Sequence, residues 1–107
     1  MKPIFFAAAL SLVFSLPPAL AQDAYPSKPV RVVVPFPPGG VVDILARMFT
    51  PKFGENLKQS IVIDNRGGAN GNIAVELVAK SQPDGYTILF GQVSNVAVNP
   101  AIYPTVP

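Results

Sequence analysis

Apolar residues alternate along the chain between short unbroken runs and longer stretches with helical spacing. Val30 to Phe36, Ser60 to Asp64 and Tyr86 to Phe90 are short runs rich in β-branched and aromatic residues, typical of buried strands. Val42 to about Leu57 and Asn72 to Lys80 repeat apolar residues every three or four positions, typical of helices with one buried stripe. The alternation predicts an α/β fold, in which helices cover the faces of a parallel sheet.

Individual residues refine the ends of these elements. Pro51 lies inside the first helix, where it removes a backbone donor and crowds the preceding turn, so we expect a kink or two short helices. Asn72 is the expected N-cap of the second helix. A polar loop from Gln92 to Asn95 follows the third strand, and we predict no helix or strand beyond it. Three strands and two helices leave a sheet edge uncovered, so we expect the beginning of a longer domain.

Residues 1–21 have the pattern of a secretory signal peptide. Lys2 supplies a positive start, Ile4 to Leu16 form an apolar run, and Ala19 and Ala21 are the small residues that a signal peptidase reads. The alternative is a membrane anchor, but a run of about a dozen apolar residues is too short to span a bilayer comfortably. We therefore expect export from the cytoplasm, with cleavage after Ala21.

Charge and composition exclude several classes of function. The 107 residues carry a formal net charge of +2, and removal of Lys2 with the signal peptide lowers it to +1. The remaining cations are scattered, without the basic stripe of a nucleic-acid-binding protein. Histidine and cysteine are both absent, which removes the commonest general base and the commonest zinc ligands. We expect no nucleic-acid partner, no metal, no cofactor and no catalytic residue.

The segment after the first strand says most about function. Pro35, Pro37 and Pro38 remove backbone donors, and Gly39-Gly40 allows the chain to turn before a helix begins. Unsatisfied N–H groups and the positive end of the helix dipole meet at such a place, which therefore attracts anions. The segment predicts a binding site for a small anion.

Loops follow the carboxyl ends of all three predicted strands, at Pro37 to Asp43, Asn65 to Asn72 and Gly91 to Asn95. Ligands of open α/β sheets gather outside those ends, so we expect the loops to line one wall of one site. The glycines of the second loop permit close approach of a ligand, although ordinary turn chemistry also explains them. Asp43 is either a ligand contact or a residue that stabilises the helix dipole. Arg66 either clamps a carboxylate or pairs with a nearby acid.

A nucleotide-using enzyme also begins with a strand, a glycine loop and a helix. This chain lacks both G-x-G-x-x-G and G-x-x-x-x-G-K-[ST], and its prolines remove donors that would cradle a pyrophosphate. Ser60, Ser81 and Ser94 have no histidine partner for hydrolysis. Binding of a small anion is therefore the stronger hypothesis.

Several motifs, in the same order along the chain, resemble one known family. They are Tyr25-Pro26-Ser27-Lys28-Pro29, Val-Pro-Phe-Pro-Pro-Gly-Gly from Val34 to Gly40, Asp43, Ala46-Arg47, Asn65-Arg66, Gly71-Asn72-Ile73, Asp84-Gly85-Tyr86-Thr87 and Asn99-Pro100. The set is similar to the Bug family, the periplasmic receptors of tripartite tricarboxylate transporters. The resemblance implies an incomplete, parallel-sheet, three-layer half of a Venus-flytrap periplasmic-binding-protein fold. Residues 22–107 would form the N-terminal part of ligand-binding domain 1, without the second domain and hinge.

The resemblance also implies which residues contact the ligand. Carried over by position, they are Pro38, Gly39, Gly40, Val42, Asp43, Gly68, Ala69, Gly71, Asn72, Gln92, Ser94 and Asn95. Four positions depart from the family pattern. Val42 stands where Thr or Ser is common, Gly67 where Pro is frequent, Asn70 where Gly is frequent, and Lys58 where a helix-ending Gly is frequent.

The function implied by the resemblance is that of a receptor and not of an enzyme. A monomeric periplasmic protein would close on a small carboxylate or related metabolite and deliver it to membrane transporter subunits. Two alternatives stay open, a truncated and non-functional remnant of such a receptor and, less favoured, a fragment of a nucleotide-binding enzyme.

Overall fold

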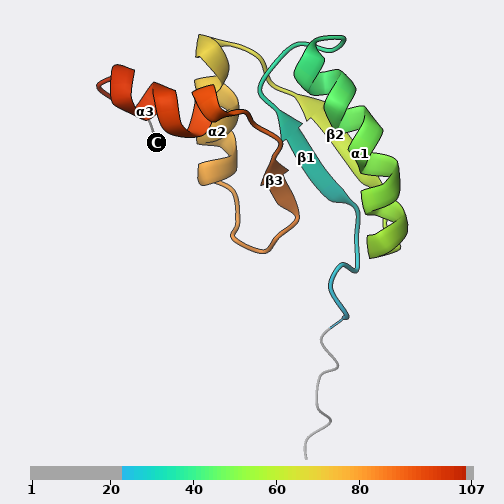
Figure 1. Cartoon of the computed structure of the whole chain (residues 1–107). Coiled ribbons are helices and arrows are strands. Elements are labelled where there is room, and N and C mark those ends of the chain that lie inside the picture. The colour runs from blue at the N-terminus through green and yellow to red at the C-terminus, as the bar shows by residue number, and fades with distance from the viewer. Residues whose placement is uncertain (1–22, 106–107) are drawn as a thin grey trace, which may run out of the picture.

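Three parallel strands form the centre of the computed structural model, which describes residues 23–105. The strands are β1 (Val30–Val34), β2 (Ile61–Asn65) and β3 (Thr87–Leu89), and their order across the sheet is β2-β1-β3 (Figure 1). The expected signal peptide and its cleavage after Ala21 lie outside the described residues. The chain thus has the parallel α/β architecture that its hydrophobic pattern predicts.

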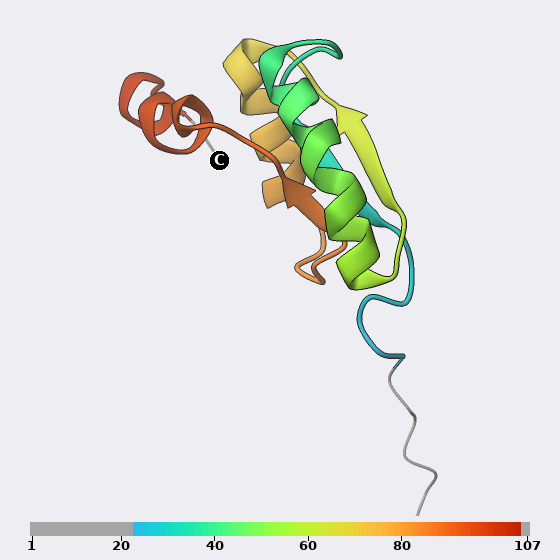
Figure 2. The ribbon, with the colours of Figure 1, turned by 45° about the vertical axis from the view of Figure 1, so that its right-hand side comes forward.

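Helices cover the sheet on two sides. Helix α1 (Val41–Leu57) packs on one face, and α2 (Asn72–Ala79) lies behind the sheet in the view of Figure 2. On the α1 face, Val32 of β1 is in register with an isoleucine on each neighbouring strand and packs near Ala46 of α1. These contacts make a three-layer arrangement with its core between α1 and the sheet.

Strand β1 is central because nearly all of its residues are apolar. Val30, Val32, Val33 and Val34 are each at most 2% exposed. Burial of a valine side chain stabilises a fold by about 1.5–3 kcal/mol, so a run of this kind strongly favours the middle of a sheet. The prediction of a strand buried on both faces is confirmed.

Helix α1 continues through Pro51 without a break, so of the kink or two short helices that we expected, the two short helices are wrong. Proline at this place cannot donate to the carbonyl of Arg47, four residues earlier. Both residues lie on the exposed side of the helix. Water can therefore hydrate the freed carbonyl, while the apolar stripe on the opposite side keeps the helix in place.

Two expectations about the second half of the chain are also corrected. Gly71, with φ +86°, precedes the first residue of α2, and the Asn72 side chain makes no capping hydrogen bond. The segment after β3 is helical, with a π-helical stretch η2 (Ser94–Val98) followed by α3 (Asn99–Ile102), where a polar loop was expected. Side chains on this segment form hydrogen bonds with residues distant in sequence, and these tertiary contacts override the local polar pattern. Within residues 23–105, none of the helices combines the length and the apolar composition of a membrane span.

The end of α1 places a lysine in a conformation that favours glycine. Lys58 has φ +54°, and its N–H donates to the Glu55 carbonyl at 3.2 Å. The N–H of Gln59 donates to the Gly54 carbonyl, also at 3.2 Å. This pair of hydrogen bonds is a Schellman motif, which normally has glycine at the left-handed position.

Lys58→Gly is expected to stabilise the protein by about 1 kcal/mol, because a left-handed backbone strains any residue with a β-carbon. Lys80 at the end of α2 is the matched control, since its φ is −90° and its backbone is ordinary helix. Lys80→Gly is expected to destabilise by about 0.5–1 kcal/mol through loss of chain entropy. Thermal unfolding of both variants checks the prediction, and a lower Tm for Lys58→Gly would contradict it.

Candidate functional site

The three loops that follow the strands lie along one edge of the sheet, as parallel pairing requires (Figure 1). We call residues 35–40 the first loop, 66–71 the second loop and 90–93 the third loop. The first two touch, because a β-carbon built on Gly67 would lie 3.4 Å from the Pro37 side chain. The loops therefore form one continuous surface at the carboxyl ends of the strands, which we call the carboxyl edge.

A buried carboxylate organises the first loop. Asp43 is 2% exposed, and its Oδ2 accepts hydrogen bonds from the Gly39 N–H and from Arg47 Nε, each at 2.9 Å. Its Oδ1 accepts a hydrogen bond from Asn65 Nδ2 at 3.0 Å, and the same Nδ2 donates to the Phe36 carbonyl at 3.0 Å. Both carboxylate oxygens are thus occupied within the protein. Asp43 holds the first loop against the end of β2 and does not offer a free charge to a ligand.

These contacts also keep Asp43 ionised. The hydrogen bond from Arg47 and those from the Gly39 N–H and Asn65 lower the pKa of Asp43 to about 2, against the opposing effect of burial. The same carboxylate raises the pKa of Arg47. The first loop is therefore fixed by a permanently charged pair at neutral pH.

The beginning of α1 has backbone donors with no acceptor. Gly40 N–H donates weakly to the Pro37 carbonyl at 3.4 Å, and the first helical bond runs from the Ile44 N–H to the Gly40 carbonyl. Among residues 23–105, no acceptor meets the N–H groups of Val41 and Val42. Such donors and the positive end of the helix dipole attract an anion.

The second loop has an uncommon backbone. Four consecutive residues have positive φ, namely Gly68 at +118°, Ala69 at +48°, Asn70 at +54° and Gly71 at +86°. A hydrogen bond of 2.9 Å from the Gly71 N–H to the Gly68 carbonyl closes the turn. Left-handed geometry is strained at Ala69, and strain of this kind clusters at functional sites.

Peptide planarity fixes the direction of the donors in this turn. The Gly68 carbonyl accepts from Gly71, and the Ala69 carbonyl accepts from the Asn72 N–H. Because the carbonyl and the N–H of a trans peptide point in opposite directions, the N–H groups of Ala69 and Asn70 are turned away from the turn. No residue of the described chain accepts from them. Adjacent, outward-facing N–H groups of this kind form an anion-binding concavity.

Glycine suits both ends of this turn, because other groups lie close around Gly71, while Gly68 has a φ of +118° that residues with a β-carbon rarely adopt. A β-carbon on Gly71 would lie 2.2 Å from Asn95 Nδ2 and 3.0 Å from the Pro35 β-carbon. One on Gly68 would lie 2.7 Å from Ile73 Cδ1. Gly71 therefore sits wedged between the first loop and the helical segment that follows the third loop.

The residues expected in the third loop lie at the start of this helical segment. Gln92 Nε2 donates to Ser94 Oγ at 2.9 Å, and the Gln92 N–H donates to Asn95 Oδ1 at 3.2 Å. Asn95 is fully buried, and its Nδ2 donates to the Asn70 carbonyl at 3.0 Å. The third loop is thereby joined to the second.

The expected ligand residues separate into two groups. Those exposed at the carboxyl edge are Pro38, Gly39, Gly40, Gly68, Ala69 and Gln92. Those buried or half-buried and turned to the protein are Val42, Asp43, Gly71, Asn72, Ser94 and Asn95. The structure brings both groups to one edge, where the second group supports the first.

Three asparagines at this edge were missed as site residues, Asn65, Asn70 and Asn99. The available signal was their place in the sequence, since Asn65 ends a buried strand and Asn70 lies in the glycine-rich segment from Gly67 to Gly71. Of the two roles considered for Arg66, the structure favours pairing with a nearby acid, because Arg66 Nε donates to Asp64 Oδ1 at 2.9 Å. Burial raises the pKa of Asp64, but Arg66 and Arg31 outweigh that effect and leave the pKa below its usual range.

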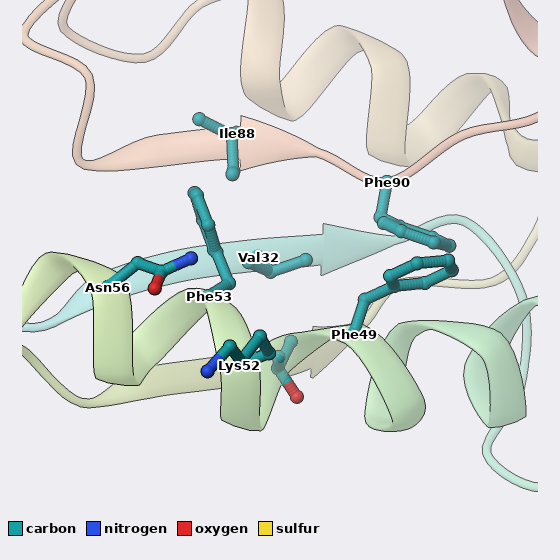
Figure 3. A pocket seen from close by; sticks show the side chains of 8 residues that line it. Val32, Phe49, Lys52, Phe53, Asn56, Ile88 and Phe90 are labelled. Carbon is teal, nitrogen blue, oxygen red and sulfur yellow. The ribbon is translucent and has the colours of Figure 1, made fainter.

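An apolar groove lies on the α1 face, apart from these donors (Figure 3). It has a volume of about 410 Å³ and is lined by Val32, Phe49, Thr50, Lys52, Phe53, Asn56, Ile88 and Phe90. The rings of Phe49 and Phe90 have centroids 6.2 Å apart. The groove presents mostly hydrocarbon, and its cation, Lys52, is paired with Glu55 Oε2 at 3.0 Å, so a carboxylate would lose hydration there for few donors. The described residues also contain no cluster of side chains suited to a metal ion.

Comparison with known proteins gives a consistent result. Residues 45–107 match the sequence pattern of a protein family described as the tripartite tricarboxylate transporter family receptor. The UPF0065 protein of the tcbD-tcbE intergenic region in Pseudomonas sp. (strain P51) is 46% identical over 92% of this chain and 29% of its own length. Protein BugT of Bordetella pertussis is 40% identical over 82% of this chain and 27% of its own length. The chain thus spans less than a third of these relatives.

Solved structures agree with the sequence matches. A periplasmic transporter superposes with a TM-score of 0.73 at 50% identity, over 77% of this chain and 27% of its own. MatC from Rhodopseudomonas palustris, with bound malate, superposes with a TM-score of 0.73 at 38% identity, over 77% of this chain and 28% of its own. A second R. palustris protein, with adipate, superposes with a TM-score of 0.59 at 49% identity, over 61% of this chain and 22% of its own. The family and its solved members are substrate-binding proteins, not enzymes.

Asp43→Asn is expected to lower stability at neutral pH, and the difference from wild type should shrink in acid. The folded pKa of about 2 lies below the ordinary value of 3.8, so the ionised side chain stabilises the fold fully above about pH 4 and progressively less towards pH 2. Both proteins also lose the contribution of Asp64 in acid, because its pKa is lowered too.

Thermal unfolding between neutral pH and pH 2 measures this effect. Glu55→Gln is the control, since Glu55 is an exposed carboxylate on the same helix. A stability difference between Asp43→Asn and wild type that stays constant over the whole range would contradict the assignment.

Proposed function

This chain belongs to the tripartite tricarboxylate transporter receptor family, and we propose that it forms one wall of an extracytoplasmic receptor for a small carboxylate. The observation that carries the proposal is the group of unpaired backbone N–H donors at one sheet edge. They come from Val41 and Val42 at the start of α1 and from Ala69 and Asn70 in the left-handed turn. Membership of this family supports the resemblance to Bug receptors, and the expected receptor function was based on that resemblance.

The donors suit a carboxylate for electrostatic reasons. A hydrogen bond to a charged group contributes about 1.5–3 kcal/mol, and a neutral backbone donor costs less desolvation than a lysine or arginine would. Arg47 and Arg66 are already paired with Asp43 and Asp64. The ligand charge is therefore met by main-chain dipoles, and the two acids are shielded by their own partners.

One wall does not account for tight binding. Micromolar affinity requires about 8 kcal/mol net, after the entropy of association has been offset. The solved relatives are more than three times as long as the part of them that this chain matches. We infer that an opposing wall from a second domain closes over the carboxyl edge and excludes water from these hydrogen bonds.

The ligand class that we propose is that of two solved relatives. MatC was solved with malate and the second R. palustris protein with adipate, and both are short dicarboxylates. We propose a ligand of that class, bound in the periplasm by a monomer after removal of residues 1–21. We also propose that the protein delivers its ligand to the membrane subunits of a tripartite transporter and has no nucleic-acid partner.

The function can be tested by calorimetry. The full exported product of the gene is titrated with malate and, separately, with adipate. At least one is expected to bind with micromolar affinity. Val41→Pro should raise Kd by about 10- to 100-fold, because it removes one donor to a charged ligand. Proline is tolerated at the first helical position, and Gly40 already has the extended backbone that precedes proline.

Val41→Ala is the matched control, because it shortens the exposed side chain and keeps the N–H. Its Kd should stay close to that of wild type. Equal affinities for Val41→Pro and Val41→Ala would remove the start of α1 from the site. Binding of neither dicarboxylate by the wild-type protein would favour the alternative of a non-functional remnant.

A further inference from the structure

We propose that Asn99, with Asn95, is a positioning residue that holds the Gly68–Gly71 turn in its left-handed, donor-presenting conformation. The inference rests on the proposed function, in which that turn contacts the carboxylate. Neither asparagine touches the ligand in this proposal. Their role is to fix the backbone that does.

The contacts of Asn99 converge on the turn. Its side chain is fully buried, and its Nδ2 donates to the Asn70 carbonyl at 3.0 Å and to Asn72 Oδ1 at 2.7 Å. Its Oδ1 accepts from Asn70 Nδ2 at 3.0 Å. Asn95 adds a second donor to the same Asn70 carbonyl, at 3.0 Å. One carbonyl oxygen thus receives two buried amide donors.

Fixing this carbonyl fixes the rest of the turn. The Asn70 carbonyl and the Gly71 N–H belong to one peptide plane, so holding the first directs the second towards the Gly68 carbonyl. That closing bond in turn leaves the Ala69 N–H facing outward. If the turn relaxed to a right-handed form, the buried Asn95 and Asn99 donors would lose their acceptor. The loss of two buried hydrogen bonds opposes the relaxation that backbone strain at Ala69 favours.

The arrangement couples two loops that are distant in sequence. Asn95 and Asn99 are four residues apart and project from one side of η2 and α3, which follow the third loop. Their acceptors belong to the second loop and to the start of α2. The helical segment therefore acts as a brace, and the two loops keep one relative position when a ligand arrives or leaves.

Hydrogen exchange of the Gly71 amide, measured without ligand on the protein as its gene encodes it, tests the brace. Asn99→Asp keeps the shape of the side chain but places an acceptor against the Asn70 carbonyl and Asn72 Oδ1. Exchange at Gly71 should become at least tenfold faster, and the Kd for malate or adipate should rise by about tenfold. Asn56→Asp is the control, because Asn56 is exposed and lies at the apolar groove, apart from the turn, and both quantities should stay at wild-type values.

A second pair of variants decides the matter if Asn99→Asp does not fold. Asn70 is exposed, so replacing it does not remove core packing. Asn70→Ala removes the hydrogen bond to Asn99 Oδ1 and keeps a β-carbon in the left-handed turn, so its Gly71 exchange should exceed that of wild type and of Asn70→Gly by several-fold. Glycine needs no support there, so Asn70→Gly should keep most of the wild-type affinity.

The outcomes separate the two proposals. Unchanged Gly71 exchange in Asn99→Asp would overturn the brace whether or not a ligand binds, and so would wild-type exchange in Asn70→Ala, which lacks the hydrogen bond to Asn99 Oδ1. Faster exchange with unchanged Kd would also overturn it, by showing that the turn does not serve the site. A wild-type protein that binds neither dicarboxylate would refute the receptor function alone, because the exchange measurement needs no ligand.

Discussion

Strand β1 is paired along both edges and covered on both faces, and the other elements are placed by contact with it. β2 and β3 take their register from it, while α1 and α2 pack on opposite sides. Because all three strands run in the same direction, their carboxyl ends meet at one edge. The burial of four valines in this strand thus decides where the loops of the candidate site lie before any of the loop residues is considered.

The loops at that edge are held by two sets of fully satisfied polar side chains. Asp43 with Asn65 and Arg47 fixes the first loop, and the asparagines of the helical segment after β3 fix the second. Among residues 23–105, no buried side-chain nitrogen or oxygen lacks a hydrogen-bond partner. Since each unmet buried group would cost about 1–3 kcal/mol, the loops have little freedom to rearrange. Rigid loops in turn reduce the entropy that a bound ligand would have to offset.

Hydrophobic periodicity was sufficient to predict the three strands, the helices α1 and α2 and the parallel sheet, but not the helical segment after β3. A run such as Val32 to Val34 has only one stable environment, and apolar spacing of 3.6 residues identifies a helix without further information. Polar residues were harder to place, because the sequence does not distinguish a hydrated asparagine from a buried one. Asn95 and Asn99 were therefore assigned to a loop or to none of the elements, although hydrogen bonds to Asn70 and Asn72 place them in a buried helical segment. For the same reason Asp43 was left between a ligand contact and a structural role, which only its occupied oxygens decide.

The proposed carboxylate anchor of backbone N–H groups would have a consequence for how such receptors diverge. Every residue except proline supplies the same main-chain donor, so mutations at an exposed position such as Val41 would change the neighbourhood of the ligand without removing its anchor. Single substitutions could then change which ligand is bound while the affinity for carboxylates is retained. The glycines and asparagines that shape the backbone could not be replaced in this way, so the residues that set the backbone would differ from those that set ligand specificity.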